Sequence, residues 1–256
     1  RKRLVTLSFK KPLILTRINQ DNQEFVNLFL NTYKLGDDIN LFKFFPLFEI
    51  IFEKGIQQNK GIDSNCLICT SRYGVQALSF VSDSASKDIF CVGQSTADLA
   101  LNSGFKKVFY PDVGNVSKLV ELICLKLGSS ASSLHYLRGK EVSYDLKSEL
   151  TKFGYQVSES IVYRQQRLTQ NRDIDTFISK EKAGGVVFFS ANVAKIFCDG
   201  IKIVPEGFLF FCISNRVAQV VYEKQLQGNY KVRIASQPTK EEIINLIYNE
   251  KSVWPN

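Results

Sequence analysis

Hydroxyl and arginine side chains stand at the ends of several short apolar runs. Arg17 follows the run LILT, and Arg138 holds the matching place in the later run LHYLRG. An arginine at a strand end can pair with a ligand carboxylate, although a surface arginine without a ligand is the commoner case. Thr70 and Ser71 end a third run, and Ser190 ends a fourth. Their hydroxyls can bind a ligand, but they are at least as well suited to capping the helices that follow.

A turn with the sequence GQSTA, at positions 93–97, follows another buried run. Glycine gives the backbone room to approach an anion, and Thr96 offers a hydroxyl donor. By itself this turn is only weak support for a binding site.

Common catalytic motifs are missing from the sequence. It contains no GxGxxG after a strand, no GxxxxGK[ST], no GxSxG and no HExxH. A Ser/His/Asp triad would have to use the single histidine, His135, whose place inside a predicted strand favours a core or sheet-face residue. Cys66 and Cys69 form a CxxC pair without a second half, so no metal site is expected.

Composition indicates a folded protein that favours an anionic partner. The 256 residues include 33 basic and 25 acidic side chains, a net charge of +8. The basic residues are scattered and not interleaved with aromatics, so nucleic acid is not expected as a partner. No apolar run reaches the ~20 residues of a membrane span, and no export signal is recognised, which predicts a cytoplasmic protein without a membrane partner. The cysteines lie in apolar runs interpreted as strands and are expected to be buried, reduced thiols: Cys66, Cys69, Cys91, Cys124, Cys198 and Cys212.

Short β-rich runs alternate with helix-like stretches, which predicts parallel sheets with helical crossovers. Four runs in the first half, at 13–17, 66–71, 89–93 and 108–111, are followed by four in the second, at 134–139, 186–190, 208–214 and 232–236. Three landmark pairs agree nearly in register, with offsets of 121, 119 and 121 residues: Arg17 with Arg138, Ser71 with Ser190, and Gly93 with Ser214. The agreement indicates an internal duplication.

Helices are expected to begin directly behind most of these strands. Thr239 and Glu242, for example, form a capping box ahead of an apolar stretch. Helix N-termini then gather at the carboxyl ends of the strands, where free amides and the helix dipole favour anions. A carboxylate-binding cleft is therefore expected. Two further runs, at 42–50 and 155–164, match in position and are either edge strands or a connection between domains, and Pro46 suits an edge or a linker.

Taken in order, these runs resemble the uroporphyrinogen-III synthase family over about residues 11–250. The most specific landmarks are VGQSTADLALNSG at 92–104 and the pattern GxxVxxxxVY from Gly154 to Tyr163. Others are the opening ILTR, TSRYGV at 70–75, LRG at 137–139, FFSANVAKIF at 188–197 and the pattern PTxExII from Pro238. The resemblance rests on order and spacing, because no single motif would suffice.

The resemblance implies two similar α/β domains with parallel sheets flanked by helices, joined by a two-stranded connection. The chain would start in one domain, build the second and return. Residues 1–41 and 168–256 would form the first domain, 51–154 the second, and 42–50 with 155–167 the connection. The substrate would lie in the cleft between the domains.

The resemblance also implies a cofactor-free lyase of haem biosynthesis, which converts the linear tetrapyrrole hydroxymethylbilane to uroporphyrinogen III. A monomer is expected. Water is lost and the last pyrrole ring is inverted as the macrocycle closes. Because the substrate is activated by its own electron-rich pyrroles, correct positioning would be the main catalytic contribution. A two-domain protein that binds a small polyanion without turnover is the alternative from another functional class.

Roles can be carried over at the positions that match the family. Tyr163 matches a tyrosine that faces the cleft and can assist loss of the hydroxyl. Thr96, Ser71 and Ser190 match hydroxyls that bind substrate. In the second repeat the family pattern GxxTA is replaced by SNRVA at 214–218, so Ser214, Asn215 and Arg216 are the candidates there. Either Arg216 takes the place of the missing hydroxyl as a carboxylate partner, or this side of the cleft contributes only backbone donors. Thr70, Arg17 and Arg138 complete the predicted set. Tyr73 stands where the family often has a basic residue.

Overall fold

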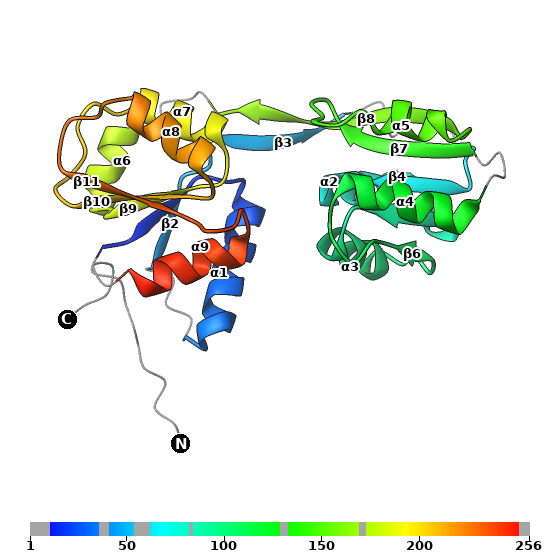
Figure 1. Cartoon of the computed structure of the whole chain (residues 1–256), viewed down its shortest axis with the longest axis horizontal. Helices are drawn as coiled ribbons and strands as arrows, with labels where there is room; N and C mark the ends of the chain where they lie inside the picture. Colours follow the sequence, from blue (N-terminus) through cyan, green and yellow to red (C-terminus); the bar gives the residue numbers. More distant parts are fainter. Residues whose placement is uncertain are drawn as a thin grey trace, which may run out of the picture. The chain divides into compact units, whose positions relative to one another are not determined.

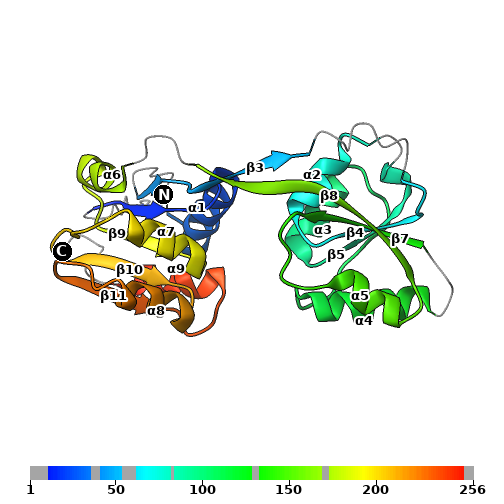
Figure 2. The same ribbon diagram turned by 90° about the horizontal axis from the view of Figure 1, so that it is seen from above.

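The computed structural model describes residues 11–35, 41–53, 62–81, 84–128, 133–168 and 173–250. The chain divides into two compact units (Figures 1 and 2). Unit 1 comprises Arg1–Glu49 and Arg167–Asn256, and unit 2 comprises Ile50–Gln166. The chain therefore leaves unit 1, builds unit 2 and returns.

Unit 1 contains a five-stranded parallel sheet in the order β11-β10-β9-β1-β2. Its strands are β1 (Leu13–Leu15), β2 (Phe42–Phe44), β9 (Gly185–Phe188), β10 (Phe208–Cys212) and β11 (Tyr230–Ile234). Helices α1 (Asn19–Tyr33) and α9 (Lys240–Asn249) cover one face. Helices α6 (Ile174–Glu181), α7 (Ala191–Asp199) and α8 (Asn215–Glu223) cover the other face (Figure 1).

The three inner strands of unit 1, β1, β9 and β10, are buried on both faces, which is why they appear in the sequence as unbroken apolar runs. Alternate residues enter different cores: Phe210 packs beneath α7 and α8, whereas Phe211 packs beneath α1 and α9. Phe210 is fully buried and has the rings of Phe208, Phe188 and Tyr230 around it, with centroids 5.2, 6.0 and 5.4 Å away. Aromatic packing of this kind supplies much of the core of unit 1.

Unit 2 contains a six-stranded sheet in the order β3-β8-β7-β4-β5-β6. Its strands are β3 (Phe48–Phe52), β4 (Cys66–Cys69), β5 (Asp88–Cys91), β6 (Val108–Phe109), β7 (Ser133–Gly139) and β8 (Gln156–Arg167). Helices α2 (Arg72–Leu78) and α3 (Gln94–Asn102) pack on one face, and α4 (Val116–Leu127) and α5 (Leu146–Lys152) on the other (Figure 2). A short 3-10 helix, η2 (Ser84–Ser86), precedes β5.

The duplication inferred from the offsets is confirmed by the two sheets. Strands β11, β10, β9, β1 and β2 of unit 1 have the same lateral order as β6, β5, β4, β7 and β8 of unit 2. The registers agree as well: Leu15 lies opposite Val187, three residues before Ser190, and Tyr136 lies opposite Ile68, three residues before Ser71. Arg17 and Arg138, two residues further on, are therefore structurally equivalent.

The run 42–50 differs from its expected form. The structure divides it at Pro46 into β2, which lies beside β1 in the sheet of unit 1, and β3, which pairs with β8. Proline has no N–H for a ladder and therefore suits the linker between the two strands. The N–H of Glu53 donates to the carbonyl of Val162 and that of Leu168 to the carbonyl of Leu47, so β3 and β8 run antiparallel. The predicted domain and connection boundaries stay a prediction.

Two cysteines lie in helices and not in the strands that were expected. Cys124 belongs to α4 and Cys198 to α7, because the apolar residues around each recur with helical spacing. The described cysteines are free thiols and all are buried except Cys124, which is half-buried. Within the described residues, no helix has both the length and the apolar character that crossing a membrane requires.

Candidate functional site

Each sheet has a point where two neighbouring parallel strands are followed by connections to opposite sides of the sheet. In unit 1 the chain continues from β1 to β2 on one side and from β9 to β10 on the other, and in unit 2 the pair is β7 and β4. Ligands of open α/β sheets bind beyond the carboxyl ends of the strands at such a switch point. The segments that follow these strands are therefore the candidate site of each unit.

In unit 2 the switch point carries a set of linked hydroxyls. The Oγ of Ser71 accepts a hydrogen bond from the N–H of Tyr73 at 3.2 Å and so caps α2. The Oγ1 of Thr70 lies 2.8 Å from the hydroxyl of Tyr136, which is buried. Both predicted hydroxyls thus have structural partners, and Ser71 remains half-buried. The linkage through Tyr136 was not predicted from the sequence.

Tyr163, on β8, lies at the same switch point. Its ring centroid is 5.4 Å from that of Tyr73, with the ring planes inclined at 59°. Burial raises the pKa of Tyr163, and interaction with the Ser71 side chain opposes that rise. The phenol therefore keeps its proton at neutral pH, and a half-buried O–H group is present to donate to a ligand.

The two predicted arginines are both beside carboxylates. In unit 1 the Nη2 of Arg17 lies 2.8 Å from Asp21, and its guanidinium lies 4.9 Å from the ring centroid of Phe189. In unit 2 the Nε of Arg138 lies 3.1 Å from Glu159, and its Nη1 donates to the carbonyls of Gly139 and Lys140. Within the described residues, the Nη1 of Arg17 and the Nε of Arg138 are buried without an aligned hydrogen-bond acceptor. These contacts favour a structural role for Arg138 in particular.

The GQSTA turn begins α3 in an unexpected way. Gly93 is the N-cap in extended conformation and supplies no side-chain cap, so the first amides of α3 are left for other acceptors. Thr96 is only 4% exposed, whereas an open donor was expected from the sequence. Thr96 is buried because it shares the face of α3 that also buries Ala97 and Ala100.

In unit 1 the equivalent residues are more open. Ser190 is exposed and caps α7 by accepting from the N–H of Val193 at 3.2 Å. Ser214 is the N-cap of α8 but makes no side-chain capping bond. Asn215 and Arg216 follow it and are exposed in the first turn of α8. Arg216 forms no ion pair with any residue in the described part of the chain, so its charge is available to an anionic ligand.

His135 has a structural environment, as the strand pattern suggested. Its Nδ1 lies 2.7 Å from the Oγ of Ser158 and its Nε2 lies 2.9 Å from the Oγ of Ser160, both on the neighbouring strand β8. Burial lowers the pKa of His135, so the ring is neutral at neutral pH. Among the described residues, no three histidine, cysteine or acidic side chains gather as metal ligands.

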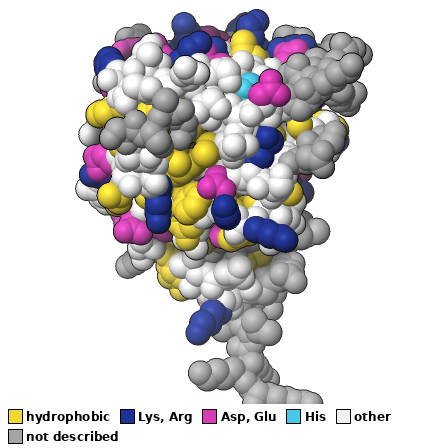
Figure 3. Space-filling model, turned by 90° about the vertical axis from the view of Figure 1, so that its right-hand side faces the viewer, with side chains coloured by type: hydrophobic (Ala, Val, Ile, Leu, Met, Phe, Trp, Pro, Cys, Tyr) yellow, Lys and Arg dark blue, Asp and Glu magenta, His cyan; other side chains and the backbone are white. Residues whose placement is uncertain are grey.

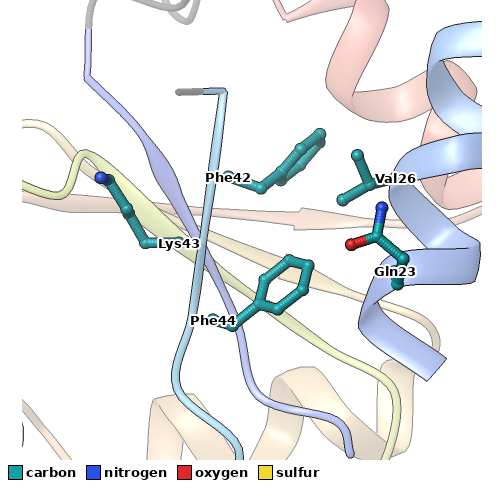
Figure 4. A pocket seen from close by; sticks show the side chains of 5 residues that line it. All are labelled: Gln23, Val26, Phe42, Lys43 and Phe44. Atoms are coloured by element: carbon teal, nitrogen blue, oxygen red, sulfur yellow. The ribbon is translucent and has the colours of Figure 1, made fainter. Parts of the chain in front are cut away.

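A small pocket lies elsewhere, at the edge strand of unit 1. It has a volume of about 230 Å³ and is lined by Gln23, Val26, Phe42, Lys43 and Phe44. Figure 4 shows the two phenylalanines and the α1 side chains converging, while Lys43 points away from them. The Nζ of Lys43 lies 3.2 Å from Glu181. The pocket contains none of the predicted site residues.

On the face shown in Figure 3, acidic and basic side chains are interspersed around a strip of apolar ones.

A family model described as uroporphyrinogen-III synthase HemD matches residues 43–245, more than half of the chain. The chain belongs to the uroporphyrinogen-III synthase family. The reaction of this family closes hydroxymethylbilane to uroporphyrinogen III, a lyase reaction of haem biosynthesis, so the substrate is a linear tetrapyrrole. No curated protein matches the chain by sequence.

Solved structures of the same family resemble the chain. Uroporphyrinogen-III synthetase from Helicobacter pylori is 20% identical, with a TM-score of 0.59, and the match covers 93% of this chain and 98% of that one. Uroporphyrinogen III synthase from Thermus thermophilus is 14% identical, with a TM-score of 0.39, and the match covers 93% and 95% of the two chains. The first likeness supports the predicted α/β fold.

Proposed function

We propose that the chain cyclises hydroxymethylbilane with the residues beyond the carboxyl ends of its two sheets. The observation that carries the proposal is the family match over residues 43–245. The two switch points indicate where on each sheet the substrate would bind. The substrate is rich in carboxylates. Free helix amides, capping hydroxyls and an exposed arginine are groups that bind carboxylates.

The residues divide between the two units. In unit 2, Tyr163, Ser71 and the first turn of α3 would meet the substrate. In unit 1, the exposed Ser190 and the first turn of α8, with Asn215 and Arg216, would do so. That both sets act on one substrate in a cleft between the domains stays a prediction. Thr96 would contribute through the small part of it that is exposed.

The proposed mechanism requires no strong acid or base from the protein. The pyrrole nitrogen assists departure of the substrate hydroxyl, which leaves as water once it has gained a proton, and a cationic azafulvene remains. Tyr163 would donate a hydrogen bond to the departing oxygen. The terminal ring then attacks through its substituted carbon to form a spiro intermediate. The original bond from that carbon to its methylene bridge breaks, the bridge re-forms at the free α-carbon of the same ring, and loss of the proton on that carbon gives the inverted ring. Positioning of that ring against the azafulvene selects the type III isomer.

We expect the purified protein, without added metal or nucleotide, to convert fresh hydroxymethylbilane mainly to the type III isomer. Product isomers would be separated by chromatography after oxidation to the porphyrins and compared with a reaction without protein. Type I product alone would overturn the proposed activity. Tight binding of the tetrapyrrole without turnover would instead establish the polyanion-binding alternative.

Replacing Arg216 with alanine should raise the apparent KM several-fold at low salt and by less at high salt. The reason is that an exposed cation attracts a polyanion through a screened field. Steady-state kinetics at two ionic strengths measure the effect. Lys202→Ala is the matched control, because Lys202 is an exposed cation of unit 1 in the loop before β10, at the amino edge of the sheet. Equal KM values for Arg216→Ala and wild type at both salt concentrations would remove Arg216 from the site.

We also infer that the protein acts as a monomer in a reducing compartment such as the cytoplasm. Free thiols at all six cysteines support the compartment. The monomer is supported by the presence of both sheets, and all the proposed contacts, in a single chain. Sedimentation at assay concentration and cell fractionation test the two inferences.

A further inference from the structure

Tyr163 is placed by an irregularity in β8. The parallel pairing of β7 with β8 is regular from Ser133 to Arg138, which lies opposite Ile161, but Gly139 lies opposite Tyr163. One residue, Val162, is thus inserted as a β-bulge. Bulges redirect the side chains that follow them. Here both Val162 and Tyr163 pack against the same apolar cluster beneath α2 and α3, although consecutive residues of a regular strand face opposite sides.

Gly139 provides the space that the redirected ring occupies. A Cβ atom added to Gly139 would lie 2.8 Å from two carbons of the Tyr163 ring and 3.0 Å from its hydroxyl oxygen. These distances are shorter than van der Waals contact, so any larger residue would displace the ring. Gly139 is not among the glycines with a positive φ. The need for glycine here is therefore steric and not conformational.

Tyr73 supplies a second contact to the same ring. It stands in the first turn of α2, where its N–H is fixed by the Ser71 cap, and its ring centroid is 5.4 Å from that of Tyr163. Both tyrosines are half-buried. An aromatic pair in this range is attractive beyond the area it buries and restricts how both rings can turn.

We propose that Gly139 and Tyr73 are positioning residues that, together with the β8 bulge, fix the direction of the Tyr163 phenol at the switch point of unit 2. The inference rests on the proposed function for its catalytic meaning. Tyr73 would act through its ring, because the ring is the part of the side chain that contacts Tyr163. At a position where the family often has a basic residue, this chain therefore has an aromatic side chain that contacts Tyr163.

The kinetic test compares Gly139→Ala, Tyr73→Ala and Tyr73→Phe. The first two should lower kcat by about ten- to hundredfold, with little change in KM and with a larger share of type I product, because a displacement near 1 Å costs about that much. Tyr73→Phe should keep wild-type kinetics. Tyr33→Ala is the control, because the ring of Tyr33 also stacks on another ring, that of Tyr248, with centroids 3.5 Å apart. This pair lies in unit 1, near the C-terminal ends of α1 and α9. Wild-type kcat and isomer ratio in Tyr73→Ala would overturn the proposal for Tyr73, and the same result in Gly139→Ala would overturn it for Gly139.

A second measurement does not depend on turnover. The ultraviolet titration of Tyr163 is obtained by subtracting the titration of a Tyr163→Phe variant made in the same background. Burial raises the pKa of Tyr163, so removal of the Tyr73 ring should admit water and lower that pKa, whereas Tyr73→Phe should not. An unchanged Tyr163 titration in Tyr73→Ala would overturn the contact itself. If wild-type protein lacked synthase activity, the proposed function would fail while this titration still decided the positioning.

Discussion

Tyr163→Phe is expected to lower kcat by about ten- to hundredfold while the protein stays folded. The substitution removes only the phenol hydroxyl, whose O–H group would donate a hydrogen bond to the departing oxygen from a protonated, half-buried residue. A hydrogen bond to a group that gains charge is worth roughly 1.5–3 kcal/mol, which corresponds to this range of rates. Single-turnover kinetics with hydroxymethylbilane would separate the chemical step from product release.

The matched control for this variant is Tyr155→Phe. Tyr155 also lies in unit 2, and its hydroxyl donates to the carbonyl of Gly128 at 2.5 Å, but it precedes β8 at the amino edge of the sheet. Its loss should cost about 1 kcal/mol of stability and leave kcat unchanged. Equal rates for Tyr163→Phe and wild type would exclude a catalytic role for the Tyr163 hydroxyl.

Phe210→Ala should reduce the free energy of unfolding of unit 1 by about 3–5 kcal/mol. Phe210 is fully buried in the middle of β10, and alanine would leave a cavity among Phe188, Phe208 and Tyr230. Urea unfolding followed by circular dichroism measures the loss. Because a chain of two units need not unfold in one transition, each transition of the variant is compared with the corresponding transition of the wild type.

Phe80→Ala controls for the loss of a phenyl ring as such. Phe80 is 44% exposed and touches one ring, that of Phe52, with centroids 5.9 Å apart. Its removal should cost below about 1 kcal/mol, since little area returns to water. A similar loss of stability in both variants would show that packing around Phe210 is looser than its burial indicates.

The strands and their duplication could be predicted because parallel strands are covered by helices on both faces. Where both faces are buried such strands must be apolar, so β4, β9, β10 and residues 89–91 of β5 are visible as unbroken runs bounded by polar residues. The cap of α9 was also predictable, because Thr239 accepts from the N–H of Glu242 within one turn of chain. Cys124 and Cys198 were placed wrongly in strands, since short apolar runs fit a buried helix face equally well.

The capping serines were predictable in position, whereas the contacts around the candidate site were not. Ser71 and Ser190 are N-caps at strand ends, as their place in the sequence indicated, and Ser214 is the N-cap of α8. The ion pair of Arg138 could not be predicted, because its partner Glu159 lies on the adjacent strand β8 and is brought near only by pairing in the sheet. The burial of Thr96 likewise followed from how α3 packs on the sheet.

What the sequence determined by itself was therefore local or periodic: strand order along the chain, helix starts, hydroxyls at strand ends and the spacing that indicated the family. Only the tertiary structure decided which residues meet Tyr163. Tyr73, Gly139 and Tyr163 come from three separate segments, and their contact depends on the single extra residue at Val162. A one-residue change of register turns a side chain to the other face of a sheet, and no local pattern in β8 records where that change occurs.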